Sequence, residues 1–199
     1  MRFIGLTGGI ASGKTTVRKM FEELGAYTLD ADELSHKTLY QKDVYQKLLK
    51  HFGSDILNKN REVDRKKLGR IVINDRKELR FLESVVHPKI AEMRDAFIEN
   101  VKKKDKDAVI IYDVPLLYEK KMENMFDTII VVYVDRKTQI KRIMERNKIS
   151  EEGAEKRLKL QMDIEEKKKK AQIIIDNRGT QNDTFKQVKN IWNKTIKGG

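Results

Sequence analysis

The stretch FIGLTGGIASGKTTVRKMF, from Phe3 to Phe21, carries the strongest structural signal in the chain. An apolar run enters a glycine-rich turn, and an amphipathic segment follows, so the pattern G-x-x-x-x-G-K-[ST] stands between an expected strand and an expected helix. Glycines permit backbone conformations that a Cβ would block, and the amides of such a turn point at phosphate oxygens, helped by the positive end of the helix. The motif therefore predicts a phosphate-binding loop (P-loop) for a nucleotide, made of Gly9, Ile10, Ala11, Ser12, Gly13, Lys14, Thr15 and Thr16.

Two side chains of this loop have a predicted chemical role. Lys14 would reach the β- and γ-phosphates, and the Thr15 hydroxyl would ligate Mg²⁺. The alternative, a glycine-rich turn without function, does not explain why the lysine and the threonine follow the last glycine. The motif leaves the fate of the phosphoryl group open, because it serves kinases, ATPases and proteins that only bind nucleotides.

Short β-branched runs alternate with helical patterns along the whole chain. This alternation predicts an α/β fold of the three-layer P-loop type, with a parallel five-stranded sheet covered by helices on both faces. The expected strands cover residues 2–8, 26–30, 108–114, 128–134 and 172–176, and the expected helices cover 14–24, 32–52, 65–72, 76–103, 137–146, 151–170 and 184–194. Trp192 shares one face of the last helix with Val188 and Ile191, which predicts a core position.

The segment after the second strand lacks a strong strand pattern for too long to be one crossover, so we interpret it as a helical insertion. We expect a single domain of 199 residues. Its nucleotide-binding core would comprise residues 1–31, 106–145 and 171–199, its substrate-binding insertion residues 32–105, and its lid residues 146–170.

Composition narrows the function classes. A net charge of +12 is compatible with nucleic acid or with small polyanions as ligands. The lysines alternate with acids and aromatic residues make up only 7%, so we expect no nucleic-acid partner. No apolar run approaches the roughly 18 residues of a membrane span, and no secretory signal is recognisable. The absence of cysteine excludes disulfides and thiolate metal sites and favours a cytoplasmic location.

Two aspartates follow expected strands. Asp32 comes after the strand that succeeds the P-loop helix, where the residue could cap the next helix or act as a base towards a hydroxyl. Asp113 ends an apolar strand in the manner of a Walker B acid, which holds Mg²⁺, although a plain strand-end turn is the alternative. Pro115 ends this strand pairing, and we expect Leu116 and Leu117 to be exposed apolar residues that touch a substrate.

Arginines mark the expected lid. Arg142 and Arg146 are four residues apart on one helix face, and Arg157 follows on the next helix. Guanidinium groups there would neutralise charge on a transferring phosphoryl group, whereas a solvated, salt-bridged helix is the alternative. Asn177 lies in the turn DNRG after the last strand, which is either a simple turn or a contact to the nucleotide base.

In their order along the chain, these pieces resemble the dephospho-coenzyme A kinase family. The similarity covers nearly the whole chain and lies in IGLTGGIASGKTTV (4–17), LDADELSHKTL (29–39), FGSDIL (52–57), VDRKKLGRIV (63–72), LESVVHPKI (82–90), DVPLLYE (113–119), QIKRIMERN (139–147) and RLKLQ (157–161). The family commonly has glycine at the position of Ala11 and serine at that of Thr15, changes that keep the motif chemically intact.

The resemblance implies a monomeric kinase that phosphorylates the ribose 3′-hydroxyl of dephospho-coenzyme A (dephospho-CoA) with ATP and Mg²⁺. It implies catalytic roles for Lys14, Asp32, Arg142 and Arg146, and contacts of Arg142, Arg157 and Asn177 with ATP. The acceptor would contact Asp32, Arg65, His87, Pro115, Leu116 and Leu117, while Thr15 and Asp113 would hold the metal. A kinase for a nucleoside or nucleoside monophosphate, or a nucleic-acid-stimulated ATPase, are the alternatives.

Overall fold

A computed structural model describes residues 1–196 of the chain. It divides into two compact units, one formed by Met1–Asp30 with Val101–Gly199 and the other by Ala31–Asn100. The expected assignment of residues 32–105 to a substrate-binding insertion stays a prediction. The two units are described separately below.

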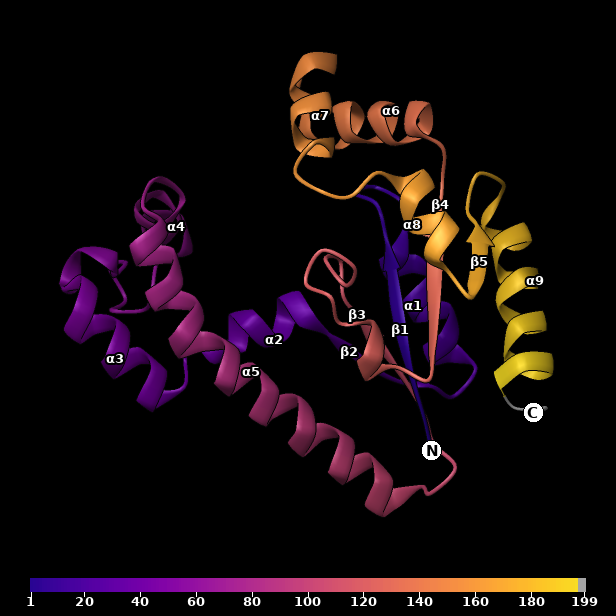
Figure 1. The fold of residues 1–199 in the computed structure, drawn as a ribbon, viewed down its shortest axis with the longest axis horizontal. Helices are drawn as coiled ribbons and strands as arrows, with labels where there is room; N and C mark the ends of the chain where they lie inside the picture. Colours follow the sequence, from indigo (N-terminus) through magenta and orange to yellow (C-terminus); the bar gives the residue numbers. More distant parts are fainter. Residues whose placement is uncertain (197–199) are drawn as a thin grey trace. The chain divides into compact units, whose positions relative to one another are not determined.

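The first unit contains a five-stranded, wholly parallel sheet in the order β2-β3-β1-β4-β5 (Figure 1). This arrangement confirms the predicted fold, including the weak strand pattern after the P-loop helix. The strands are β1 (Arg2–Gly8), β2 (Tyr27–Asp30), β3 (Val109–Asp113), β4 (Thr128–Tyr133) and β5 (Ile173–Asp176).

Helices of the first unit follow the sequence pattern with one clear exception. The predicted single helix over residues 151–170 is wrong, because the chain leaves the helix after Leu158 and starts a new one where Asp163 caps the amide of Glu165. The helices are α1 (Lys14–Glu23), α6 (Arg136–Asn147), α7 (Glu151–Leu158), α8 (Ile164–Lys170) and α9 (Gln181–Ile191), with a π turn at Trp192–Ile196.

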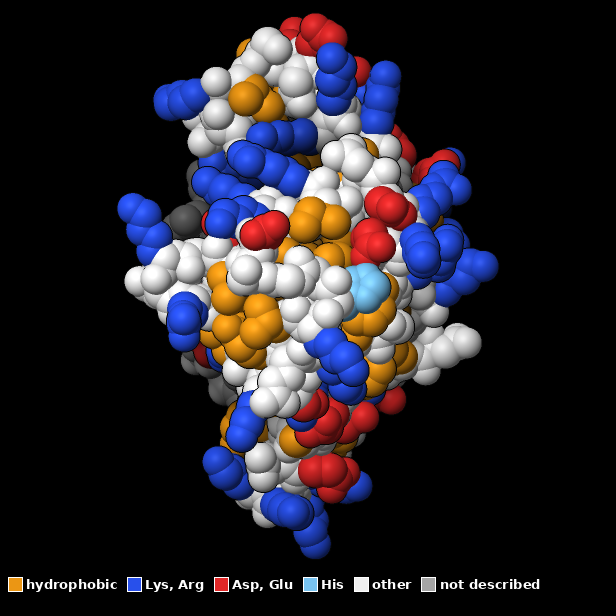
Figure 2. All heavy atoms as spheres, turned by 90° about the vertical axis from the view of Figure 1, so that its left-hand side faces the viewer, with side chains coloured by type: hydrophobic (Ala, Val, Ile, Leu, Met, Phe, Trp, Pro, Cys, Tyr) orange, Lys and Arg blue, Asp and Glu red, His pale blue; other side chains and the backbone are white. Residues whose placement is uncertain are grey.

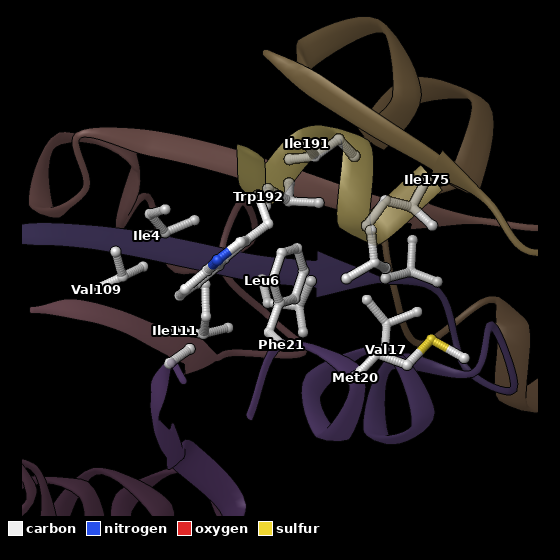
Figure 3. Close-up of a cluster of buried hydrophobic side chains, with 14 residues drawn as sticks. Ile4, Leu6, Val17, Met20, Phe21, Val109, Ile111, Ile175, Ile191 and Trp192 are labelled. Atoms are coloured by element: carbon white, nitrogen blue, oxygen red, sulfur yellow. The ribbon is translucent and has the colours of Figure 1, made fainter. Parts of the chain in front are cut away.

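Alternate side chains of β1 face opposite sides of the sheet, as strand geometry requires. Ile4 and Leu6 lie in a buried cluster with Phe21 of α1 and Trp192, whose rings are 6.4 Å apart (Figure 3). Trp192 is only 7% exposed, which confirms its predicted core position. This cluster packs α1 and α9 on one face of the sheet and thereby fixes the start of α1, where the P-loop ends.

On the opposite face, Phe3 stacks on Phe126 with ring centroids 5.1 Å apart. Gly5 leaves room for Leu117, since a Cβ on this glycine would come within 2.7 Å of the leucine side chain. Leu117 is fully buried. The expectation of an exposed residue at position 117 is therefore wrong: its side chain covers the sheet, whereas Pro115 and Leu116 are half-buried.

The second unit is helical and has a core of its own. Its helices are α2 (Ala31–Thr38), α3 (Lys42–Phe52), α4 (Arg65–Asn74) and most of α5 (Arg76–Lys104). The predicted single helix over residues 32–52 is interrupted by a turn in which the Gln41 amide donates to the Thr38 carbonyl. Leu39 of this turn joins side chains of α3, α4 and α5 in one cluster, which contains Leu39, Val44, Leu48, Ile56, Val63, Leu68, Val72 and Val86.

Within residues 1–196 the structure contains no helix that is long and apolar enough to cross a membrane. Figure 2 shows lysine and arginine side chains interspersed with aspartate and glutamate on the face that it draws. The excess positive charge is thus mixed with acids on this face, as the sequence pattern indicates.

Candidate active site

The P-loop connects Gly8 to Lys14 and adopts two left-handed backbone conformations. Gly13 has φ of +90°, and Ala11 has φ of +61°, a region in which a Cβ is unfavourable. The loop closes on itself because the Ser12 amide donates to the Gly9 carbonyl at 3.1 Å. A Cβ on Gly13 would collide with the side-chain amide of Asn177, so glycine is required there for packing as well as for its φ.

A cavity of about 600 Å³ opens over this loop. Lys14, Arg142 and Arg146 bring positive charge to the cavity, and Glu145 is the one acid that lines it. Such a balance suits a polyphosphate, whose charge the cations and the loop amides can share. The complete lining is Gly9, Ala11, Ser12, Gly13, Lys14, Thr15, Arg142, Glu145 and Arg146.

Lys14 and Asp113 form an ion pair beside this cavity. The ammonium nitrogen of Lys14 lies 3.6 Å from Oδ1 of Asp113, and the carboxylate side chain is only 5% exposed. Parallel pairing places Asp113 level with Leu6 of β1 and with Asp30 of β2, so the carboxyl ends of the three strands meet at one edge. The structure thus brings together the predicted phosphate-binding lysine and the predicted Walker B acid.

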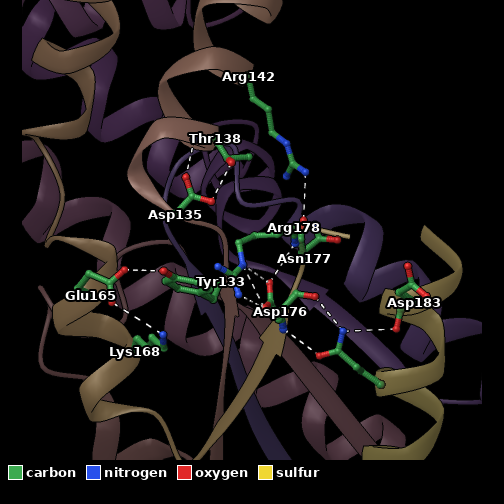
Figure 4. A network of polar contacts seen from close by, with 11 residues as sticks. Tyr133, Asp135, Thr138, Arg142, Glu165, Lys168, Asp176, Asn177, Arg178 and Asp183 are labelled. Carbon is green, nitrogen blue, oxygen red and sulfur yellow. Dashed lines mark hydrogen bonds and ion pairs between the residues drawn. The ribbon is translucent and has the colours of Figure 1, made fainter. Parts of the chain in front are cut away.

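Asn177 and Arg142 both contact the P-loop and are joined to each other by a hydrogen bond, which Figure 4 shows. The Asn177 side-chain nitrogen donates to the Ser12 carbonyl at 2.7 Å, and the Thr184 hydroxyl donates to the Asn177 side-chain oxygen at 2.7 Å. Arg142 donates to the carbonyls of Asn177 and Ala11, at 3.1 and 3.4 Å. Asn177 is 8% exposed and does not line the cavity, so its observed contact is with the loop, and its predicted contact with adenine stays a prediction.

Two glutamines that we did not predict as site residues hold the peptide groups of Ile10. Gln139 of α6 donates to the Ile10 carbonyl at 2.8 Å, and the side-chain oxygen of Gln161 accepts from the Ile10 amide at 3.0 Å. Gln139 is buried, and it falls on the inner face of α6 with Ile143. That helical spacing was the available signal. Gln161 stands four residues after Arg157, which is also a helical spacing, but α7 ends at Leu158.

The remaining predicted lid arginines differ in their surroundings. Arg146 is exposed, lines the cavity and donates to the side chain of Asn147 at 3.1 Å. Arg157 of α7 is also exposed but does not line the cavity. Arg142 and Arg146 thus line the same cavity, and the roles of Arg142, Arg146 and Arg157 stay predictions.

A polar network flanks the loop after β5 (Figure 4). The Tyr133 hydroxyl donates to Glu165 at 2.6 Å, and this hydrogen bond, together with burial, raises the pKa of Tyr133 to about 12. Asp135 caps α6 by accepting from the amide and hydroxyl of Thr138, which lowers the pKa of its carboxyl. Arg178 pairs with Asp176 at 2.6 Å and lowers the pKa of that carboxyl. These contacts hold the two ends of the segment between β4 and β5, whose helix α6 carries Arg142.

Three predicted residues lie in the second unit. Asp32 is exposed in the first turn of α2, which begins at Ala31, so it is not the residue that precedes the helix. Arg65 is exposed and begins α4 directly after its cap, Asp64. His87 is exposed on α5, with its Nε2 3.9 Å from Glu83.

The donor set for a metal is small. Within the described part of the chain, no three His, Cys, Asp or Glu side chains gather in a way that could hold an ion. Thr15 and Asp113 fit a different site, in which a hydroxyl and one carboxylate complete a coordination sphere made mostly of phosphate oxygens and water. Thr15 lines the cavity, and Asp113 Oδ1 is buried beside Lys14.

The sequence model of the dephospho-CoA kinase family matches residues 2–183. The chain belongs to this family. The dephospho-CoA kinase of Fusobacterium nucleatum is 44% identical over 93% of this chain and 94% of the relative, and that of Aquifex aeolicus is 43% identical over 96% of each. The solved dephospho-CoA kinase of Campylobacter jejuni is 33% identical, with a TM-score of 0.75 over 98% of both chains. Family membership confirms the resemblance drawn from the sequence fragments, in agreement with the parallel sheet and the P-loop.

Proposed function

We propose that this enzyme transfers the γ-phosphoryl group of ATP to the ribose 3′-hydroxyl of dephospho-CoA and so forms coenzyme A and ADP. ATP as the phosphoryl donor is supported above all by one observation: Lys14, Arg142 and Arg146 line a single cavity over the P-loop. Membership of the dephospho-CoA kinase family supports the acceptor.

In this proposal the triphosphate lies along the P-loop amides, with Lys14 at the β- and γ-phosphates. Arg142 and Arg146 neutralise charge on the transferring group, which is the main protein contribution to phosphoryl transfer. Arg142 is already aligned by two carbonyls, whereas Arg146 is exposed and has room to approach the phosphates. Arg157 and Asn177 are proposed as further ATP contacts.

Thr15 and Asp113 are the residues that would hold Mg²⁺. Bound there, the ion would offset the negative charge of the phosphates. The chain's own contribution is the Lys14–Asp113 pair, which holds the carboxylate next to the loop.

Asp32 is proposed to orient the ribose hydroxyl and accept its proton. The residue follows β2 by two positions and lies in the first turn of α2. Further acceptor contacts are proposed for Arg65, His87, Pro115 and Leu116. Leu117 is proposed to act indirectly, since its side chain is buried against the sheet.

The enzyme is further proposed to work in the cytoplasm as a monomer, without a nucleic-acid partner. Light scattering on the purified chain tests whether it is a monomer.

The activity is tested with a panel of acceptors in the presence of Mg-ATP. ADP release that depends on dephospho-CoA supports the proposal. Release that depends on a nucleoside or nucleoside monophosphate supports the other kinase class, and stimulation by DNA or RNA alone supports an ATPase.

A further inference from the structure

Lys167 of α8 is fully buried although it begins a run of four lysines. Its neighbours Lys169 and Lys170 are exposed. Lys167 follows the buried Ile164 by three residues and therefore lies on the inner face of the helix. A buried ammonium group is costly unless it is paired and hydrogen-bonded, so its partners define what it does.

The ammonium group of Lys167 donates to two acceptors that lie on one short segment of the chain. Nζ of Lys167 lies 2.8 Å from Oε1 of Glu119 and 2.9 Å from the carbonyl oxygen of Pro115. Both belong to residues 114–119, which follow β3 and the predicted metal ligand Asp113. The Pro115 carbonyl also accepts from the Thr7 hydroxyl of β1, at 3.3 Å. Lys167 therefore connects α8 to a segment that is also attached to the central strand.

Glu119 extends this connection to the base of the lid. Its Oε1 accepts a second hydrogen bond, from the amide of Met162, at 2.8 Å. Met162 directly follows Gln161, whose side chain holds the amide of Ile10 in the P-loop. The buried Glu119 Oε2 accepts no hydrogen bond from the described residues, so Lys167 supplies the opposite charge that this carboxylate requires.

The electrostatics of Lys167 reflect this position. Burial lowers the pKa of its ammonium group, the interaction with Glu119 opposes that effect, and the charge of Lys14 lowers the pKa further. The charge of the P-loop lysine thus acts on Lys167. Its own side chain is fully withdrawn from solvent and so is not available to touch a substrate.

We propose that Lys167 is a positioning residue for the acceptor: its ammonium group holds residues 114–119, which carry Pro115 and Leu116, in the conformation that binds dephospho-CoA. This inference rests on the proposed function for the identity of the acceptor. It predicts that loss of the ammonium group weakens the use of dephospho-CoA far more than the use of ATP, because the P-loop keeps its own supports from Gln139, Gln161 and Asn177.

Lys167→Met removes the charge and keeps an unbranched side chain, and Lys169→Met is the matched control on the exposed face of the same helix. Below the unfolding temperature of each variant, we expect Lys167→Met to raise the KM for dephospho-CoA at least about tenfold and to leave the KM for ATP within about threefold (about 0.7 kcal/mol). Lys167→Arg, which retains donors for both acceptors, should recover part of the loss. Equal changes in the two KM values, or no change in either, would overturn the proposal.

Hydrogen exchange tests the anchoring without an activity assay. The amides of Lys120 and Met122 donate to the carbonyls of Leu116 and Leu117, and they should exchange at least about tenfold faster in Lys167→Met than in the Lys169→Met control. Unchanged exchange would contradict the anchoring. If wild-type enzyme released no ADP with dephospho-CoA, the proposed function would fail. The exchange measurement would still show whether Lys167 anchors residues 114–119.

A variant that does not fold is replaced by the double variant Lys167→Met with Glu119→Gln. This pair of changes removes both buried charges together, so no unpaired charge remains inside the protein. The Pro115 carbonyl still loses its ammonium donor. The same rise in the KM for dephospho-CoA and the same faster exchange are expected, and their absence would count against the proposal as for the single variant.

Discussion

The side-chain amide of Asn177 donates a 2.7 Å hydrogen bond to the carbonyl oxygen of Ser12, and thereby ties the loop after β5 to the middle of the P-loop. The same side chain accepts from the Thr184 hydroxyl of α9, so both ends of the amide are oriented. Its neighbour Gly13 has no Cβ to block this approach. The shape of the phosphate-binding loop thus depends on a residue more than 160 positions away along the chain.

Replacing Asn177 by aspartate turns this donor into an acceptor that faces the Ser12 carbonyl. The repulsion should displace the loop, so we expect the KM for ATP to rise about tenfold and the free energy of unfolding to fall by about 1–3 kcal/mol. Steady-state kinetics and urea unfolding measure the two effects. Asn182→Asp, an exposed change in the first turn of α9, is the control and should alter neither. A normal KM for ATP in Asn177→Asp would show that the loop does not depend on this hydrogen bond.

Asp32→Asn tests the proposed base. The substitution keeps the size of the side chain but removes its ability to take a proton, so kcat should fall by about 10²-fold or more while the KM for ATP stays the same. Glu33→Gln, in the same exposed helical turn, is the matched control. A kcat of Asp32→Asn within about threefold of wild type, a change below 1 kcal/mol in the barrier, would leave Asp32 with no role beyond the helix start.

Asp113→Asn tests the proposed metal ligand. The amide keeps one oxygen but loses the negative charge, so we expect the Mg²⁺ concentration that gives half-maximal activity to rise about tenfold or more. The exposed Asp107→Asn serves as control for a change of net charge at the other end of β3. An unchanged Mg²⁺ requirement in Asp113→Asn would remove this residue from the proposed metal site.

The cap of α6 predicts a specific dependence of stability on pH. Hydrogen bonds from Thr138 lower the pKa of Asp135 below 3.8, so the folded state favours the ionised carboxyl. Its contribution is therefore present above about pH 4 and is lost as the pH falls through the lowered pKa. Asp135→Asn keeps a capping side chain without this titration. Urea unfolding at pH 6 and pH 3 should show a smaller loss of stability for Asp135→Asn than for wild type, and equal losses would contradict the assigned cause.

Much of this fold can be predicted from local patterns. The buried strands read as continuous β-branched runs because parallel strands are covered on both faces, and the P-loop reads as a motif because its backbone requires glycine at φ of +90°. Helix breaks are harder to predict. The interruption after Leu158 depends on the cap at Asp163 and on the hydrogen bond from Met162 to Glu119, which involves a residue 43 positions earlier.

For the site, too, residues marked by a local pattern were predicted and residues that act through long-range contacts were not. Local patterns, a motif and a helical period, single out Lys14, Arg142 and Arg146, and the structure places all three around one cavity. Gln161 and Lys167 act through contacts with distant backbone groups, and a sequence pattern does not specify such contacts. Leu117 shows why local reasoning about the sequence can fail. From its place after Pro115 we predicted an exposed side chain, whereas Gly5 on another strand provides the space in which this side chain is buried.

The proposed function is tested most directly by measuring ADP release from Mg-ATP with and without dephospho-CoA and by determining the mass of the acceptor product. We predict release that depends on dephospho-CoA and a product heavier by one phosphate, located on the ribose 3′-hydroxyl. Release at the same rate without the acceptor, with dephospho-CoA recovered unchanged, would contradict it.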